Sequence, residues 1–203
     1  MQLVLDLAGV LIGNLTPVFW EAVAARSNIQ AGDIKKRFKR ELRENLWTGR
    51  VGAQDFWTWL DDSYAGLERT ELQSALQEAL RPLPAWNRLK DWQRSADIHL
   101  LSNHCSEWVE PMLEEVKPFI KSVTISSEAG CCKPDLAIFR RAETFMPKRA
   151  QVVYVDDQEK NLIVGRILGW DTLLADVNHD WMNKIDQRFG QGIMDEFHHR
   201  RTT

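Results

Sequence analysis

Residues 3–11, Leu-Val-Leu-Asp-Leu-Ala-Gly-Val-Leu, form the stretch from which the rest of the chain is best interpreted. Four of its first five residues are apolar, the fourth residue is Asp6, and a glycine follows three positions later. This pattern is typical of a buried strand that ends in a turn. Because open α/β sheets carry their binding groups at such strand ends, the pattern fits a functional Asp6 as well as an ordinary strand and turn.

The composition indicates a soluble, cytoplasmic protein. A chain of 203 residues can hold one core and a smaller lobe. The net charge of −3 comes from interspersed charges of both signs, so nucleic acid is not an expected partner. No secretion signal precedes the first strand, and no stretch approaches the roughly 18 apolar residues of a membrane span. We therefore expect no membrane association.

Residues 14–84 predict a small helical lobe inserted into the chain. No strand-like alternation occurs in it, and Thr16 followed by Pro17 fits the start of its first helix. Four helical patterns follow one another, over about residues 17–25, 33–46, 56–60 and 67–80. The insert resembles a lid, and its Trp20, Trp47 and Trp57 either line a ligand pocket or pack the lobe.

Residues 1–13 and 85–203 predict an α/β core. Helical patterns cover residues 86–94, 108–116, 135–145 and 162–168, and strand patterns cover residues 98–102, 123–126, 152–155 and 172–175. This alternation is typical of a Rossmann-like parallel sheet with helices on both faces. The polar end, residues 190–203, is expected to be frayed. The odd number of cysteines favours reduced thiols, with a metal-binding or redox role as the alternative.

Polar residues follow four of the predicted strands: Asp6, Ser102 with Asn103, Lys133, and Asp156 with Asp157. They should converge, because the C-terminal ends of parallel strands meet at one edge of the sheet. Three crowded carboxylates would repel one another unless a divalent cation such as Mg²⁺ neutralised them. Asp6 could then attack phosphorus while Lys133 and Ser102 stabilise the phosphoryl oxygens. This set of side chains is consistent with phosphoryl transfer.

Each of these groups also fits a structural role. Ser102 and Asn103 fit a strand-ending turn, and Lys133 fits a solvated loop cation. Asp156 and Asp157 fit an N-cap pair for the next helix. These alternatives stay open at the level of the residues alone.

The sequence resembles the haloacid dehalogenase (HAD) superfamily, in the branch whose helical cap is inserted between the first and second motifs. The first motif is matched by Asp-Leu-Ala-Gly-Val-Leu at 6–11 and the second by Leu-Leu-Ser-Asn at 100–103. The third is matched by Cys-Lys-Pro-Asp at 132–135 and the fourth by Val-Asp-Asp-Gln-Glu-Lys-Asn at 155–161. The order and spacing of the four motifs match the family up to about residue 175. The combination of motifs is specific for the family, although each motif alone is not.

The resemblance implies the roles of the residues that would act on the substrate. Asp6 matches the nucleophile and Lys133 the lysine that neutralises the phosphate. Ser102 matches the phosphate-binding hydroxyl, and Asn103 matches a neighbouring position that binds phosphate or orders the site.

The resemblance also implies a Mg²⁺ site. Its ligands would be Asp6, Asp157 as the main acidic ligand, and the backbone carbonyl of Ala8, with Asp156 supporting or also binding. Asn161 matches a position that helps to order this site.

Ala8 departs from the pattern of typical phosphatases in this family. They carry a second aspartate two residues beyond the nucleophile, as general acid and base. Alanine cannot move a proton, and positioned acid–base catalysis is worth about 10²- to 10⁴-fold in rate. Some bacterial sugar phosphate phosphatases with a similar Asp-Leu-Gly-Asn opening lack this aspartate, as do the dehalogenases. We interpret His104 as a surface or hydrogen-bonded loop histidine rather than a catalytic replacement.

Three functions follow as hypotheses. The first is a Mg²⁺-dependent phosphatase, a phosphoric monoester hydrolase of a small phosphorylated metabolite, whose cap closes over the site. The second is a non-catalytic relative that binds a phosphorylated ligand or a protein partner, which Ala8 favours. The third is a 2-haloacid dehalogenase, against which Asp156 and Asp157 argue because halide displacement needs no cation. Neither the substrate nor the oligomeric state can be inferred from the sequence.

Overall fold

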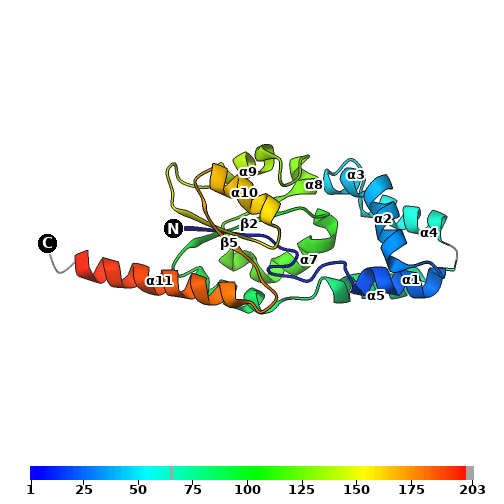
Figure 1. Ribbon diagram of the computed structural model, residues 1–203, viewed down its shortest axis with the longest axis horizontal. Helices are drawn as coiled ribbons and strands as arrows, with labels where there is room; N and C mark the ends of the chain where they lie inside the picture. The colour runs from blue at the N-terminus through cyan, green and yellow to red at the C-terminus, as the bar shows by residue number, and fades with distance from the viewer. Residues whose placement is uncertain (65, 200–203) are drawn as a thin grey trace.

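A computed structural model of the protein describes residues 1–64 and 66–199. Its centre is a parallel five-stranded sheet with the strand order β3-β2-β1-β4-β5 (Figure 1). The strands are β1 (Gln2–Leu5), β2 (Asp97–Ser102), β3 (Ser122–Ile125), β4 (Val152–Asp156) and β5 (Asp171–Leu174). The first strand lies in the middle because later segments extend the sheet on both of its sides. The predicted Rossmann-like α/β class is confirmed.

Strand β1 is apolar without alternation because both of its faces are covered. Leu3 and Leu5 face one hydrophobic cluster, and Val4 faces a second one on the other side of the sheet. The first cluster includes residues of η1 (Pro84–Arg88), α6 (Leu89–Trp92), α7 (Ser106–Val116) and α11 (Asp180–His199). The second includes residues of α9 (Leu136–Glu143) and α10 (Glu159–Ile167), on the opposite face in Figure 1. The short elements η2 (Lys117–Phe119) and α8 (Ser126–Ala129) flank β3.

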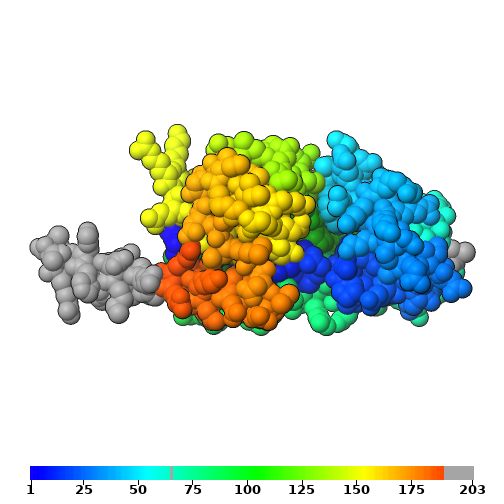
Figure 2. Space-filling model, in the orientation of Figure 1, coloured from blue at the N-terminus to red at the C-terminus, as the bar shows by residue number. Residues whose placement is uncertain are grey.

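The insert between β1 and η1 forms a separate helical lobe, which we call the cap (residues 14–84). Its helices are α1 (Val18–Ser27), α2 (Ala31–Glu41), α3 (Arg43–Trp47), α4 (Ala53–Ser63) and α5 (Arg69–Ala79). The two connections to the core run side by side, because the Gly13 amide donates to the Arg81 carbonyl and the Leu83 amide donates to the Leu11 carbonyl. Figure 2 shows the cap, blue to cyan, as a lobe against the core.

The cap packs through an aromatic cluster that reaches the core. Phe56 lies at the centre of this cluster, with Phe19 5.7 Å and Trp57 5.2 Å away between ring centroids. Phe56 also contacts Trp108 of the core helix α7 at 4.8 Å. Aromatic contacts of this kind stabilise a packing geometry beyond the area they bury. The contact between Phe56 and Trp108 therefore docks the cap on the core.

Several predicted helix boundaries were wrong. The pattern over residues 33–46 forms two helices, because the backbone leaves helical geometry at Leu42, although Leu42 is itself buried and keeps the apolar period unbroken. Helix α1 has Pro17 at its N-cap position and no side-chain cap, so Thr16 does not cap it. The pattern over residues 86–94 forms a 3₁₀ turn followed by a short helix.

The backbone of the stretch 190–199, expected to be frayed, continues α11, and residues 200–203 lie outside the described residues. The three cysteines are free, as predicted. Within residues 1–64 and 66–199, no helix has the length and apolar character needed to cross a membrane.

Candidate active site

The C-terminal edge of the sheet brings the predicted site residues together. Asp6 follows β1 directly, and its backbone amide donates to the Val155 carbonyl at 3.0 Å, which fixes it beside the end of β4. Ser102 ends β2 and Asp156 ends β4. Lys133 reaches the same point from the loop before α9. The expected convergence on one sheet edge is therefore observed.

Lys133 is buried between two carboxylates. Its Nζ lies 2.9 Å from Asp6 Oδ2 and 2.5 Å from Asp156 Oδ2. All three side chains are at most 5% exposed, so each charge depends on the others for compensation. The solvated loop cation considered for Lys133 is thereby excluded.

Asp156 is saturated with hydrogen-bond donors from the protein. Its Oδ1 accepts from the Gln158 amide at 2.8 Å and from Asn161 Nδ2 at 2.9 Å. Its Oδ2 accepts from the Tyr154 hydroxyl at 2.5 Å as well as from Lys133. Burial works against ionisation of Asp156, but Lys133 and these donors hold its pKa below the usual range. Asp156 is therefore an ionised anchor for Lys133.

Asp157 has a different environment from its neighbour. Among the described residues its Oδ1 is buried without a hydrogen-bond partner. The other oxygen lies close to the turn after β1, where a Cβ on Gly9 would be 2.5 Å from Asp157 Oδ2. Because Gly9 also has φ +84°, only glycine fits between the turn and this carboxylate. Asp157 thus presents an unsatisfied carboxylate oxygen inside the site.

The three carboxylates fit a divalent cation. One oxygen each from Asp6, Asp156 and Asp157 lies within 4.8 Å of the others. Burial raises the pKa of Asp6 to about 7, with Lys133 opposing and the other two carboxylates adding to the rise. Burial and the charge of Asp156 also raise the pKa of Asp157. A bound cation would offset the repulsion between these buried carboxylates. The unsatisfied oxygen of Asp157 favours Asp157 over Asp156 as a ligand.

The two residues of the second motif have distinct environments. Ser102 is fully buried, and its Oγ has no hydrogen-bond partner among the described residues. Asn103 instead uses its side chain on the Lys133 backbone, donating to the carbonyl at 2.8 Å and accepting from the amide at 2.7 Å. Asn103 therefore positions the Lys133 loop, and Ser102 keeps a free hydroxyl beside the site.

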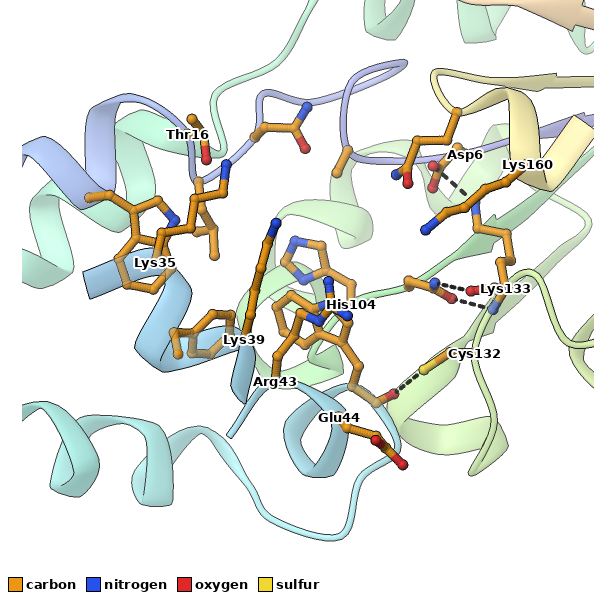
Figure 3. A pocket seen from close by; sticks show the side chains of 18 residues that line it. Asp6, Thr16, Lys35, Lys39, Arg43, Glu44, His104, Cys132, Lys133 and Lys160 are labelled. Atoms are coloured by element: carbon orange, nitrogen blue, oxygen red, sulfur yellow. Dashed lines mark hydrogen bonds and ion pairs between the residues drawn. The ribbon is translucent and has the colours of Figure 1, made fainter. Parts of the chain in front are cut away.

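A cleft of about 510 Å³ opens between the cap and the core, with Asp6, Ala8 and Lys133 on its core side. Trp20 and Trp47 line it from the cap, whereas Trp57, the third tryptophan considered, packs in the aromatic cluster. Figure 3 shows the side chains that surround this cleft. The cap and the predicted site residues of the core therefore line the same cleft.

His104 lines the same cleft and is buried, so of the two expected positions, surface or hydrogen-bonded loop, the structure shows the second. Its ring stacks on Trp47 with centroids 5.5 Å apart, and its Nδ1 lies 3.2 Å from the Cys105 carbonyl. Burial lowers the pKa of His104 to about 4, which keeps the ring neutral near pH 7. A neutral ring can donate or accept a hydrogen bond to orient a ligand, but it is not an acid strong enough to protonate a leaving alcohol.

Two groups of functional side chains were missed at the level of sequence. Tyr154 was assigned only to a strand, although its position two residues before Asp156 puts both on one face of β4. A set of cations also lines the cleft, namely Lys35, Lys39, Arg43 and Lys160. The four-residue spacing of the first three was the available signal.

No protein-family model and no curated protein matches the chain. Solved structures do match it. A HAD-like family hydrolase from Porphyromonas gingivalis has 22% identity and a TM-score of 0.75, over 92% of this chain and 96% of that one. A HAD family enzyme from Bacteroides thetaiotaomicron, in complex with magnesium and inorganic phosphate, has 20% identity and a TM-score of 0.74, over 89% and 96%.

An L-2-haloacid dehalogenase also matches, with 14% identity and a TM-score of 0.59 over 85% of this chain and 82% of that one. The protein therefore has the fold of the HAD-like hydrolases. Because a dehalogenase and an enzyme crystallised with phosphate share this fold, the choice of reaction rests on the residues of the site.

Proposed function

We propose that the protein is a Mg²⁺-dependent phosphatase that hydrolyses a small phosphorylated metabolite through an aspartyl-phosphate on Asp6. The observation that carries this proposal is the buried Asp6–Lys133–Asp156 triad at the cleft, beside the unpaired oxygen of Asp157. A carboxylate nucleophile with a fixed cation and a second acidic pair matches the needs of a dianionic phosphoryl group.

In the first step, an Asp6 oxygen attacks phosphorus, the ester P–O bond breaks, and the leaving alkoxide takes a proton from solvent because Ala8 has none to give. In the second step, water hydrolyses the aspartyl-phosphate and regenerates the Asp6 carboxylate with inorganic phosphate. Asp6 is preorganised for attack, because its Oδ1 accepts from the Leu7 amide at 2.7 Å while its Oδ2 is held by Lys133. Lys133 stays charged because Asp156 stays ionised.

Mg²⁺ would be held by Asp6, Asp157 and the backbone carbonyl of Ala8, with Asp156 in support through Lys133. When bound, the ion neutralises the carboxylates and the phosphoryl oxygens, so that the anionic nucleophile can approach an anionic ester. Ser102 supports the proposal because its unpartnered hydroxyl can donate to a phosphoryl oxygen.

Ala8 favours a second candidate, a catalytically impaired protein that binds a phosphorylated ligand in the same cleft. Ala8 lines the cleft, and its methyl group cannot protonate the leaving alcohol. The halide-displacement alternative has less support, because a dehalogenase has no use for the unsatisfied Asp157 oxygen. Turnover separates these candidates.

The test is a screen of phosphate monoesters, with p-nitrophenyl phosphate included, in Mg²⁺ and then in a chelator. We expect hydrolysis that needs Mg²⁺ and is lost in Asp6→Asn, which is nearly isosteric. Asp62→Asn, at an exposed carboxylate of the cap, is the matched control and should keep full activity. Binding of phosphate esters without turnover would support the impaired candidate, and halide release from a 2-haloacid would support the dehalogenase. Equal turnover by wild type and Asp6→Asn would exclude Asp6 as nucleophile.

A further inference from the structure

Four cations line the cleft between the cap and the core. Lys35 and Lys39 lie four residues apart on one face of α2, and Arg43, which begins α3 after the break at Leu42, lines the same cleft. Lys160, near the start of α10, faces them from the core. Figure 3 shows these side chains directed into the cleft from its two sides.

The other cations of α2 are paired with carboxylates, unlike the cations that line the cleft. Lys36 Nζ lies 3.1 Å from Asp33, and Arg37 and Arg40 lie 2.9 and 2.7 Å from Glu41. In the part of the chain that the structure describes, none of the four cleft-facing cations has a carboxylate oxygen within 4.0 Å. Glu44 also lines the cleft, but its side chain is exposed and pairs with Arg50 at 3.7 Å. One helix thus carries a neutralised outer face and an uncompensated cleft face.

Uncompensated like charges in a cleft indicate an anionic ligand. Burial lowers the pKa of Lys35, and repulsion by the charge of Lys39 lowers it further. A group of like charges without ion-pair partners attracts ligands of the opposite sign. The cleft-facing cations are not needed for the packing of the cap, because Ile34 and Phe38 make the buried face of α2.

The reaction end of the cleft does not need these cations. There the three carboxylates would be offset by Lys133 and the proposed divalent ion, which leaves that end near neutrality before substrate binds. A phosphoryl group adds only about two negative charges. An uncharged sugar or alcohol moiety would therefore leave the four cations without partners.

We propose that the substrate carries a second oxyanion, a phosphate or a carboxylate, which binds between Lys35, Lys39 and Arg43 of the cap and Lys160 of the core. This inference rests on the proposed phosphatase function, since it names the class of phosphate ester that the site accepts. The guanidinium of Arg43 can hold either oxyanion with two parallel hydrogen bonds. Binding across the cleft would also draw the cap onto the core.

The first experiment compares esters that differ by the second anion. Steady-state hydrolysis is measured with glucose 6-phosphate against glucose 1,6-bisphosphate, and with glycerol 3-phosphate against 3-phosphoglycerate. We expect kcat/KM to be about tenfold higher or more for at least one doubly anionic member. The first pair tests a second phosphate and the second pair a carboxylate. Equal values in both pairs overturn the proposal.

The second experiment uses the two faces of α2. Lys39→Ala should raise KM for the preferred doubly anionic ester about tenfold and reduce its advantage over the singly anionic ester. Lys36→Ala, on the outer face of the same helix, is the matched control and should change neither KM by more than about twofold. Equal loss for both esters in Lys39→Ala would show a structural effect and overturn the proposal.

A binding measurement keeps the inference separate from the proposed reaction. Glucose 6-phosphate and glucose 1,6-bisphosphate are titrated into Asp6→Asn by calorimetry, with Mg²⁺ present. Tighter binding of the bisphosphate, lost on adding Arg43→Ala, supports the anion site even if no ester is ever hydrolysed, in which case the phosphatase proposal alone fails. Equal affinities for the two compounds overturn the anion site whether or not the protein is a phosphatase.

Discussion

At the scale of single residues, Asp156 and Asp157 show how neighbouring identical side chains take different roles. Asp156 is surrounded by donors and holds Lys133, whereas Asp157 has a buried oxygen without a partner. The difference arises because successive residues at a strand end point to opposite sides, so only one of the two faces Lys133.

This difference predicts opposite effects of two matched substitutions. Asp156→Asn should destabilise the protein by about 3 kcal/mol, because it weakens the pairing of a buried lysine. Asp157→Asn should cost little stability, since it removes a repelled carboxylate, but should abolish Mg²⁺ binding. Urea unfolding and calorimetric titration of Mg²⁺ measure the two effects. Equal loss of stability in both variants would contradict the assignment.

Asp6 and Asp157 also predict how Mg²⁺ binding depends on pH. Their pKa values are raised, to about 7 for Asp6, so the ion must displace protons at lower pH. The ionised form is the ligand, and affinity should therefore increase from pH 6 to pH 8 by about tenfold for one displaced proton. Calorimetry in buffers of different ionisation enthalpy counts the protons released. Affinity that is constant over this range would rule out ligands with raised pKa values.

Ala8 predicts a preference among leaving groups. Without a side-chain acid at this position, an activated aryl phosphate should be hydrolysed faster than an alkyl phosphate. Ala8→Asp should raise the turnover of alkyl esters about tenfold or more. Single-turnover and steady-state rates identify the step that is accelerated. Unchanged alkyl turnover, with efficient hydrolysis by wild type, would mean that another group or the substrate carries the proton.

At the scale of elements, the turn after β1 and the end of β4 depend on each other. The turn can approach Asp157 because residue 9 has no side chain and adopts φ +84°. This close approach explains why the first motif carries a glycine at this position, which the sequence shows only as a turn signal.

Two glycine variants separate backbone strain from contact with Asp157. Gly9→Ala and Gly130→Ala both place alanine at positive φ, +84° and +73°, and each should cost about 1 kcal/mol for that reason. Gly9→Ala should also displace Asp157 and reduce Mg²⁺ affinity, whereas Gly130 has open space around it and should leave Mg²⁺ affinity unchanged. Calorimetric titration and thermal unfolding distinguish the two effects. Unchanged Mg²⁺ affinity in Gly9→Ala would contradict the role of this approach.

At the scale of the whole molecule, polar contacts join the cap to the core as well as aromatic ones. Glu107 of α7 accepts a hydrogen bond from the Ala53 amide at 2.8 Å, which places a core carboxylate at the first turn of the cap helix α4. A carboxylate there interacts favourably with the positive end of a helix. The orientation of the cap over the cleft thus depends on α7 as well as on apolar packing.

Glu107→Ala should therefore loosen the cap. We expect KM for the preferred ester to rise severalfold, and the amides of the first turn of α4 to exchange hydrogen faster, with little change in global unfolding. Glu115→Ala, at an exposed carboxylate on the same helix, is the control and should behave as wild type. Unaltered exchange in α4 would show that the Glu107 hydrogen bond does not hold the cap.

By itself, the sequence determined the class of the fold and the edge of the sheet where the chemistry lies. The apolar run before Asp6, the alternation of elements after residue 86 and the helical insert are local patterns, and local patterns are set by the periods of helices and strands. Convergence of the site residues then followed from a property shared by parallel sheets, without knowledge of any side-chain position.

Only the tertiary structure decided which charges meet. Lys133 pairs with Asp6 over 127 positions of sequence, and the cations of α2 meet Lys160 only because the cap docks on α7 through Phe56 and Trp108. Such contacts depend on the packing of whole elements, which no local period encodes. For the same reason, only the structure shows that burial keeps His104 neutral and that, among the described residues, one oxygen of Asp157 has no hydrogen-bond partner.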